Sequence, residues 1–410
     1  MTWLRRLESR LSRLTAAGVT TLAGLAGSVH AQDETSSSGY AVDAVYTADV
    51  WRNAHGGRRI GGAYLENGDL TLSVDGERAW GWTGVSAYAH VLYNNGKFFS
   101  ERYVGDAMTV SNIDAPAAVR LYEAWFEWAL PLSRPLSLRA GLYDLNSEFD
   151  NSDSRSLFIH STHGVGHELA QTGLNGPSIF PVTSLGLRAA WQPAEHWLVQ
   201  AVVLDGVPGD PNRTTGTHLH LGGQDGELVV GEVQWSRGRV HKASVGHWFY
   251  TADFDDLRST EAEPRRKRDD NSGTYAAVEI ALGDVADPDG PATLAFARYG
   301  VANDEINEYQ DSFSFGVTHR GLISARPGDQ VGLAFSRADL GSPARQIARL
   351  DGEARPGYES VIELTYRAEI NDWLTIQPDV QYIINPGADA RIADSLALGF
   401  RFELSRALLR

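Results

Sequence analysis

Apolar and polar side chains alternate along much of this chain in segments of roughly ten residues, as in strands with one apolar and one polar face. In residues 374–384 the even positions are apolar and the odd positions are largely polar, and residues 395–404 and 120–130 repeat the pattern. This is the length that a tilted strand needs to cross a bilayer. After Ala31 the chain has no apolar run long enough for a membrane-spanning helix, so a bundle of such helices is excluded.

The same pattern predicts sixteen strands. They are expected near residues 43–52, 58–75, 82–94, 119–130, 136–145, 183–192, 197–205, 227–236, 239–250, 274–283, 291–300, 312–320, 329–337, 357–369, 374–384 and 395–404. From the third strand onward, long connections alternate with tight ones, which a soluble β-sandwich has no reason to do. The chain is therefore predicted to be all-β: a transmembrane antiparallel up-and-down β-barrel of about sixteen strands, with long extracellular loops and short periplasmic turns.

The first 31 residues differ from the rest. Four arginines precede a mildly apolar stretch, and Val29-His30-Ala31 offers a cleavage site for signal peptidase. We expect residues 1–31 to be a cleavable signal peptide and residues 32–410 to form the mature barrel, because the stretch is too weakly apolar for a stable membrane anchor. Cleavage removes those arginines and one glutamate, which changes the formal net charge from −16 to −19. Such an acidic chain is a poor partner for nucleic acid.

Most tryptophans fall near the ends of predicted strands. They are Trp80, Trp82, Trp125, Trp128, Trp191, Trp197, Trp235, Trp248 and Trp373, with Tyr93 in a similar position. We interpret them as an aromatic girdle at the membrane interfaces. The alternative is a sugar-stacking track in the lumen, which the loop residues Phe149, Phe158 and Phe180 could also supply.

Five strings of residues stand out along the chain. They are Tyr122-Glu-Ala-Trp-Phe-Glu-Trp128, Arg139-Ala-Gly-Leu-Tyr-Asp-Leu-Asn-Ser-Glu-Phe-Asp150, Gly176-Pro-Ser-Ile-Phe-Pro181, Gly206-Val-Pro-Gly-Asp-Pro-Asn-Arg213 and Gln377-Pro-Asp-Val-Gln-Tyr-Ile-Ile-Asn-Pro-Gly387. Together they resemble the carbohydrate-selective porins, and the resemblance extends from about Tyr46 to Glu403. It implies a sixteen-stranded outer-membrane barrel of a Gram-negative bacterium that admits sugars by passive diffusion, often with a preference for monosaccharides such as glucose.

One departure from this resemblance concerns the end of the barrel. Barrel proteins usually finish on a terminal aromatic residue that the insertion machinery reads, whereas here Phe402 is followed by eight more residues. We expect residues 405–410 to be a short periplasmic tail or a variant insertion signal.

On the strands, the polar positions nominate side chains that face the lumen. They are Glu123, Glu127, Arg139, Arg188, Glu232, Gln234, Glu279, Glu363, Arg367, Gln377, Asp379, Gln381, Arg401 and Glu403. Facing acids and bases would create a transverse field and offer hydrogen bonds to hydroxyl groups, and arginine is suited to paired contacts. Each could equally be a structural ion pair of the barrel wall. Arg139 and Arg188 are the first candidates for contact with a permeating molecule.

The long segment after Asp144 is the candidate for a constriction loop that folds inward and narrows the pore, with an outward-facing loop as the alternative. The residues that suggest this role are Arg155, Phe158, His160, His163 and Glu168. The three histidines of this segment, with Glu168, do not match the spacing of known zinc motifs. The histidines near 218–220, the aspartates of 253–256 and the basic run 265–268 are interpreted as solvated loop groups. No metal or other cofactor is expected.

The remaining function classes are weakly supported. Ser161 lies between histidines, but the chain has no Gly-x-Ser-x-Gly string and adjacent residues on one strand cannot form a triad, so an enzyme is not expected. We expect a passive, sugar-preferring porin of the outer membrane, exported through the secretory pathway. The alternative is a general or cation-selective diffusion porin. The expected partners are sugars as permeants, outer-membrane lipid and lipopolysaccharide, and the barrel is expected to be a monomer or a homotrimer.

Overall fold

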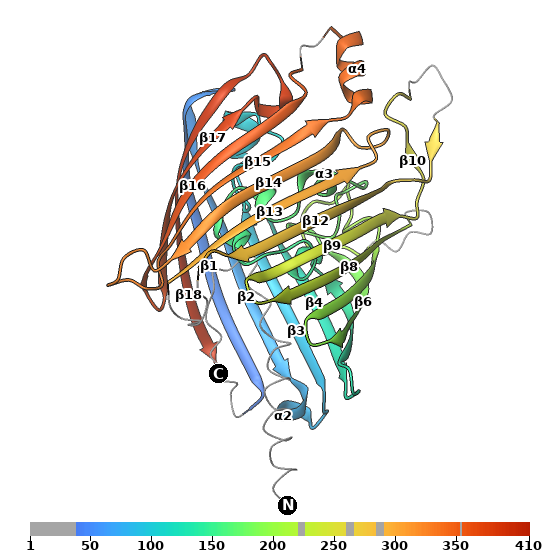
Figure 1. Ribbon diagram of the computed structural model, residues 1–410, viewed down its shortest axis with the longest axis vertical. Helices are drawn as coiled ribbons and strands as arrows, with labels where there is room; N and C mark the ends of the chain where they lie inside the picture. Colours follow the sequence, from blue (N-terminus) through green and yellow to red (C-terminus); the bar gives the residue numbers. More distant parts are fainter. Residues whose placement is uncertain (1–37, 220–225, 260–265, 284–290, 353–354) are drawn as a thin grey trace, which may run out of the picture.

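In the computed structural model, sixteen antiparallel strands close into one barrel (Figure 1). The structure describes residues 38–219, 226–259, 266–283, 291–352 and 355–410. The predicted signal peptide, residues 1–31, lies outside the described residues, as do His220 and Arg265 of the loop groups considered above.

The barrel strands follow one another around the wall in chain order, and the first pairs with the last. They are β1 (Tyr40–Gly57), β2 (Gly61–Asp75), β3 (Val85–Asn95), β4 (Ala118–Leu130), β5 (Leu136–Tyr143), β6 (Ser184–Ala194), β7 (Trp197–Asp205), β8 (Glu227–Arg237), β9 (Val240–Tyr250), β12 (Ser272–Ala281), β13 (Ala292–Ala302), β14 (Tyr309–Arg320), β15 (Gln330–Leu340), β16 (Tyr358–Asn371), β17 (Leu374–Ile384) and β18 (Ala393–Leu409). Each matches one predicted range to within a few residues at most ends, so the predicted fold class is confirmed.

The two rims of the barrel differ in their connections (Figure 1). Tight turns such as 238–239 and 372–373 lie at one rim, which we call the turn rim. The first residues of β1 and the last residues of β18 lie at the same rim. The longest connections lie at the opposite rim, the loop rim, and a separate two-stranded sheet there joins β10 (Phe254–Asp255) to β11 (Lys267–Arg268). The alternation predicted from the third strand onward is not strict, because residues 303–308 at the loop rim form a shorter connection than residues 321–329 at the turn rim.

The helices are short and lie in the connections. They are α2 (Gly76–Trp80), η2 (Ser100–Val104), η3 (Leu145–Ser147), η4 (Arg155–Leu157), η5 (Ser161–His163), α3 (His167–Ala170), α4 (Ser342–Leu350) and η6 (Pro386–Ala388). Across the part of the chain that the structure describes, no helix combines the length and the apolar character needed to cross a membrane.

Exposure alternates along the strands as the sequence predicts. In β16, Ile362 and Leu364 are 41% and 49% exposed, whereas Glu363 between them is fully buried. In β18, Phe400 is exposed and Arg401 is buried. Apolar side chains therefore cover the outside, and closure pairs each strand on both sides, which leaves no free edge in the hydrocarbon layer.

The end of the chain corrects one expectation. Residues 405–409 are not a periplasmic tail, because they continue β18, and Ser405 and Leu409 pair with Val45 and Val42 of β1. The physical reason is that β1 begins at Tyr40, so its first backbone groups need a partner on that side. A role for these residues as a variant insertion signal stays a prediction.

Within the described residues, the exposed tryptophans form a belt at a single rim. Trp80, Trp82, Trp128, Trp191, Trp197 and Trp373 are all exposed, and Trp235 is half-buried beside Trp197. All seven lie in or next to connections of the turn rim, and we call them the tryptophan belt. Trp125 and Trp248 do not belong to it, because their side chains are buried inside the barrel.

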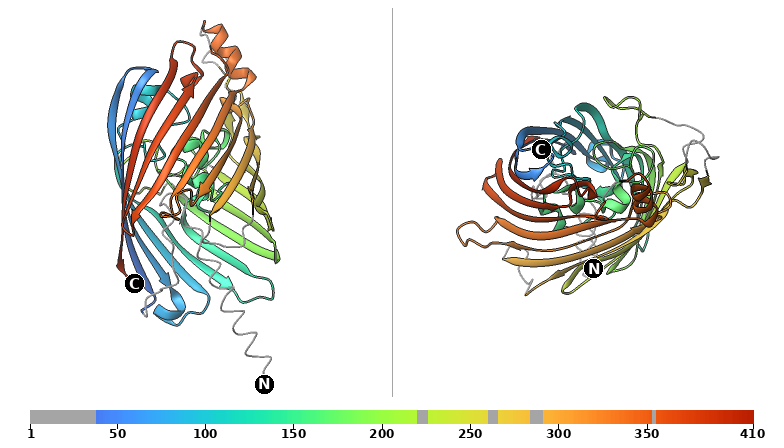
Figure 2. Two further views of the ribbon diagram at one scale, coloured as in Figure 1. Left: turned by 60° about the vertical axis from the view of Figure 1, so that its left-hand side comes forward. Right: turned by 90° about the horizontal axis from the view of Figure 1, so that it is seen from above.

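Two connections from the loop rim enter the barrel interior (Figure 2). We call residues 144–183 the inserted segment and residues 96–117 the second segment. Phe149 and Leu169 of the inserted segment pack on Val230 and Trp248 of the wall, within one apolar cluster. The interior face is therefore polar only in part, because apolar wall residues such as Trp248 pack against the inserted segment.

Candidate functional site

The strand residues nominated from the sequence all lie on the interior face of the wall. Glu127, Arg139 and Gln234 are half-buried, and the others are buried. Most of the buried ones contact the inserted segment or the second segment, while Arg367 and Glu403 approach one another at 3.7 Å near the turn rim. Their role as pore lining stays a prediction, but their positions explain how the segments are held.

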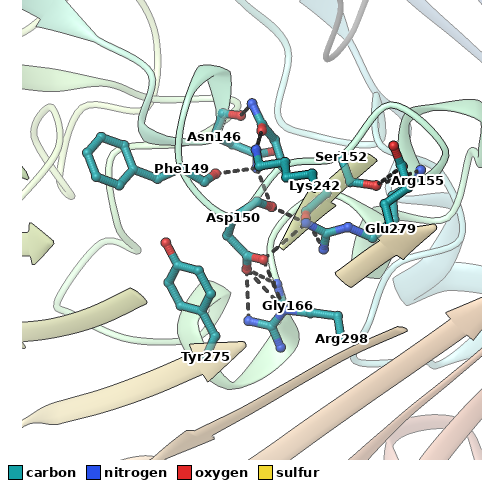
Figure 3. A network of polar contacts seen from close by, with 12 residues as sticks. Asn146, Phe149, Asp150, Ser152, Arg155, Gly166, Lys242, Tyr275, Glu279 and Arg298 are labelled. Atoms are coloured by element: carbon teal, nitrogen blue, oxygen red, sulfur yellow. Dashed lines mark hydrogen bonds and ion pairs between the residues drawn. The ribbon is translucent and has the colours of Figure 1, made fainter. Parts of the chain in front are cut away.

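Arg298 of β13 is the main anchor of the inserted segment (Figure 3). Its guanidinium donates to the Asp150 carboxylate at 2.8 and 3.1 Å and to the Glu168 carboxylate at 2.5 and 2.9 Å. Arg155 adds a second guanidinium to Asp150 at 3.1 Å, and the side chains of all four residues are almost completely buried. Burial raises the pKa of Asp150, but Arg298 and Arg155 outweigh it, so the pKa lies below its ordinary value.

Two glycines make room for this ion-pair network. A Cβ atom on Gly300 would lie 2.0 Å from the Glu168 carboxylate, and one on Gly166 would lie 2.0 Å from the Arg298 guanidinium. The Gly166 amide also donates to Asp150 at 3.2 Å. The approach of the segment to the wall therefore requires glycine at both positions.

Arg298 and Asp150 were not among the candidate site residues nominated from the sequence. In the predicted strand 291–300, Arg298 shares its face with Phe296, and a large apolar side chain suggests a lipid-facing position. In the structure Phe296 is buried against Phe158 of the inserted segment, with ring centroids 5.8 Å apart. The alternation was therefore misleading where an apolar side chain of the segment meets the wall.

Wall carboxylates also bind backbone amides of the inserted segment. Glu363 accepts from the amides of Ile159 and His160, and Glu232 accepts from the amide of Asp150 at 3.0 Å. Gln377 donates to the Leu157 carbonyl at 2.7 Å. Hydrogen bonds to a carboxylate are stronger than hydrogen bonds to a neutral acceptor, so these contacts fix the path of the segment.

Arg139 and Arg188 lie side by side in the register of β5 and β6, near the turn rim. Arg188 donates to Glu127 at 2.6 Å and to Glu148 at 2.7 and 2.9 Å, and it is buried. Arg139 pairs with Glu127 at 2.8 Å and stacks on the Trp125 ring at 3.7 Å. Arg139 is the more exposed of the two side chains.

His160 and His163 of the inserted segment are buried, and His167 is half-buried. Burial lowers the pKa of His160 to about 3 and that of His167 to about 4, and it lowers the pKa of His163 well below its ordinary value. His163 packs on Phe158, with ring centroids 4.8 Å apart. Glu168 anchors the segment by binding Arg298, and His163 contributes to packing.

The second segment is held by residues of β16 and β18. Glu359 accepts from the amides of Ala107 and Met108 at 2.8 and 2.9 Å. Arg401 donates to Asn112 at 2.7 Å and to the buried Asp49 carboxylate of β1 at 2.7 and 2.9 Å. The sequence pattern predicts only a long connection at residues 95–118, because nothing in it distinguishes these residues from an exposed loop.

Two cavities are each lined in part by the inserted segment, one toward the loop rim and one toward the turn rim. The loop-side cavity, of about 310 Å³, is lined by Arg120, Asn175, Phe180, Asp210, Arg213 and His218. The turn-side cavity, of about 300 Å³, is lined by Asp153, Glu195, Gln234, His241, Lys242 and Glu279. Residues 176–181 and 206–213, two of the strings that stand out in the sequence, meet at the loop-side cavity, where Asn175 donates to the Pro208 carbonyl at 2.6 Å.

Comparison with known proteins gives consistent matches over nearly the whole chain. A family model described as "Carbohydrate-selective porin, OprB family" matches residues 59–405. "Porin B" of Pseudomonas aeruginosa is 23% identical over 409 aligned residues, which cover 90% of this chain and 88% of that protein.

Solved structures show the same fold. The "High pH structure of Pseudomonas putida OprB" superposes with a TM-score of 0.79 at 19% identity and covers 90% of this chain and 94% of that one. The "Low pH structure" of the same protein gives a TM-score of 0.56 at 15% identity, with 90% and 93% covered.

Proposed function

Because the chain belongs to the carbohydrate-selective porin family, OprB, we propose that it lets small sugars, glucose among them, cross the outer membrane by passive diffusion. This family and this fold are those of outer-membrane channels rather than of enzymes, and a closed barrel with an apolar outer face is suited to that place. By the general rule for such barrels, the turn rim faces the periplasm and the loop rim faces the outside.

The observation that supports the proposal best is the chemistry of the loop-side cavity. Asp210 supplies a carboxylate, Arg120 and Arg213 supply guanidinium groups, and Phe180 supplies an aromatic ring. Charged donors and acceptors suit the hydroxyl groups of a sugar, and a ring suits its less polar face. A sugar would enter here, pass beside the inserted segment and leave through the turn-side cavity.

Swelling of liposomes tests sugar preference directly. We expect glucose to enter liposomes that contain the purified protein faster than sorbitol, a linear polyol of similar size. Phe180→Ala should bring the two rates together, whereas Phe249→Ala, which removes an exposed ring from the outer face, should not. Equal rates in the unaltered protein would contradict sugar preference and would favour a general diffusion porin.

Arg139→Ala and Arg188→Ala are each expected to shift the reversal potential in a salt gradient toward cation selectivity. Either change removes a positive charge beside Glu127 and Glu148. The measurement is made on single barrels in planar bilayers, and Arg134→Ala, in an exposed turn of the same rim, is the matched control. If both variants kept the conductance and the reversal potential of the unaltered barrel, these arginines would not face the permeation path.

We also propose that residues 1–31 direct secretory export and are then removed, which N-terminal sequencing of the mature protein tests. At its two rims the barrel would meet lipid and lipopolysaccharide. It would act as a monomer or a homotrimer, and native mass spectrometry of the detergent-extracted protein separates these states.

A further inference from the structure

Three side chains with metal-binding atoms meet at the wall of the turn-side cavity. Asp153 lies on the inserted segment, His241 on β9 and Glu279 on β12, and one ligand atom of each lies within 4.8 Å of the others. Nε2 of His241 is 3.5 Å from the Asp153 carboxylate and 3.9 Å from Oε1 of Glu279. Nothing in the proposed sugar pathway requires this grouping.

One carboxylate oxygen of Glu279 accepts hydrogen bonds, and the other has no donor among the described residues. Its Oε2 accepts from the Ser152 hydroxyl at 2.6 Å (Figure 3). It also accepts from the Ser154 amide at 2.7 Å, and the two contacts fix the carboxylate. The side chain is 1% exposed, and no described residue donates a hydrogen bond to Oε1. A buried oxygen without a donor is unfavourable, and a bound cation would relieve that cost.

A β-bulge turns His241 toward this oxygen. In the ladder between β9 and β12, Lys242 pairs with Glu279 and Val240 pairs with Ile280, so His241 is the extra residue between two consecutive pairs. Such a bulge breaks the strict alternation and re-aims a side chain. Without the bulge the imidazole would point to the outer face.

The charge of the cavity favours a cation. Asp153, Glu195 and Glu279 bring three carboxylates, and Lys242 brings one ammonium group. The Lys242 ammonium also lines the cavity and would oppose a metal ion, but it is directed to the amide side chain of Asn151. Two of the carboxylates, those of Asp153 and Glu279, lie beside His241.

We propose that Asp153, His241 and Glu279 bind a divalent transition metal of the zinc type. One imidazole nitrogen and two carboxylate oxygens are a donor set that zinc accepts, and the cavity leaves room for water as a further ligand. Hard cations such as Ca²⁺ prefer more oxygen ligands than this site offers. The ion would tie the inserted segment to two wall strands at the periplasmic end of the passage.

Calorimetry with Zn²⁺ on the chelator-treated protein in detergent tests the site without reference to transport. We expect one equivalent of Zn²⁺ to bind, with affinity lowered at least about tenfold in His241→Ala and in Asp153→Asn. Both altered side chains are exposed, so the barrel should fold. His247→Ala is the matched control, because His247 is exposed on the outer face of the same strand. Ca²⁺ should bind more weakly than Zn²⁺.

A second measurement, which rests on the proposed channel function, is the single-channel current. Zn²⁺ added from the turn rim should lower the current of the unaltered barrel and of His247→Ala, and leave His241→Ala unaffected. Absence of one-equivalent binding, or equal affinity in His241→Ala and the unaltered protein, would overturn the proposal and leave His241 as an ion-pair partner of the two carboxylates. Binding without a change in current would keep the metal site and count against the proposed exit route.

Discussion

Replacing Arg298 with methionine is expected to free the inserted segment from the wall and to raise the single-channel conductance several-fold. Methionine fills much of the same volume but leaves the carboxylates of Asp150 and Glu168 buried without their shared cation. Removal of one partner from a buried ion pair costs about 3–5 kcal/mol, and here one guanidinium serves two carboxylates. The segment can escape that cost by moving into water, whereas the barrel ladder does not depend on it.

Conductance of single barrels and limited proteolysis of the inserted segment measure this effect. Arg337→Met is the matched control, because Arg337 pairs with Asp339 on the neighbouring part of the wall and is about one third exposed. That variant should keep the original conductance and cleavage pattern. An Arg298→Met barrel with unchanged conductance and no new cleavage would show that the remaining contacts of Glu232, Glu279 and Glu363 hold the segment without Arg298.

Arg401→Ala is expected to lower the unfolding temperature of the whole barrel. Arg401 lies in β18 and binds the fully buried carboxylate of Asp49 in β1, across the ladder that closes the barrel. The variant leaves Asp49 with the Trp51 and Ser111 side chains as donors and no counter-charge, a loss of about 3–5 kcal/mol. The temperature at which the folded band disappears on a detergent gel measures it.

The same ladder contains its own control. Arg410 pairs with Asp43 at 2.7 Å, and both side chains are about one third exposed. An exposed pair of this kind contributes about 0–1 kcal/mol, so Arg410→Ala should shift the unfolding temperature little. Equal shifts in the two variants would mean that closure depends on the number of ion pairs and not on their burial.

Alternation of apolar and polar residues was enough to locate every barrel strand. It works because lipid and the barrel interior impose opposite demands on neighbouring residues, as at Leu364 and Glu363. It fails where the interior is itself apolar. The pattern suggests that Phe296 faces lipid, whereas the structure buries it inside the barrel. Because Arg298 shares that strand face, it was not nominated as an interior residue.

The candidate site was predictable in part. The charged strand residues and the long segment after Asp144 are apparent in the sequence, because length and polarity are local properties. Pairings such as Arg298 with Asp150 join residues 148 positions apart, and no local pattern reports them. His241 reaches the interior through a bulge, and a bulge leaves no mark in the alternation until the partner strand is known.

The tryptophan belt makes intrinsic fluorescence a probe of one leaflet. Seven indole side chains gather at the turn rim, while Trp51, Trp125 and Trp248 are shielded inside the protein. Brominated phospholipid confined to the inner leaflet should therefore quench much of the emission, and the same quencher in the outer leaflet should quench little. Since indole rings favour the headgroup region, the tryptophan belt at the turn rim mainly determines how deeply the barrel sits in its bilayer.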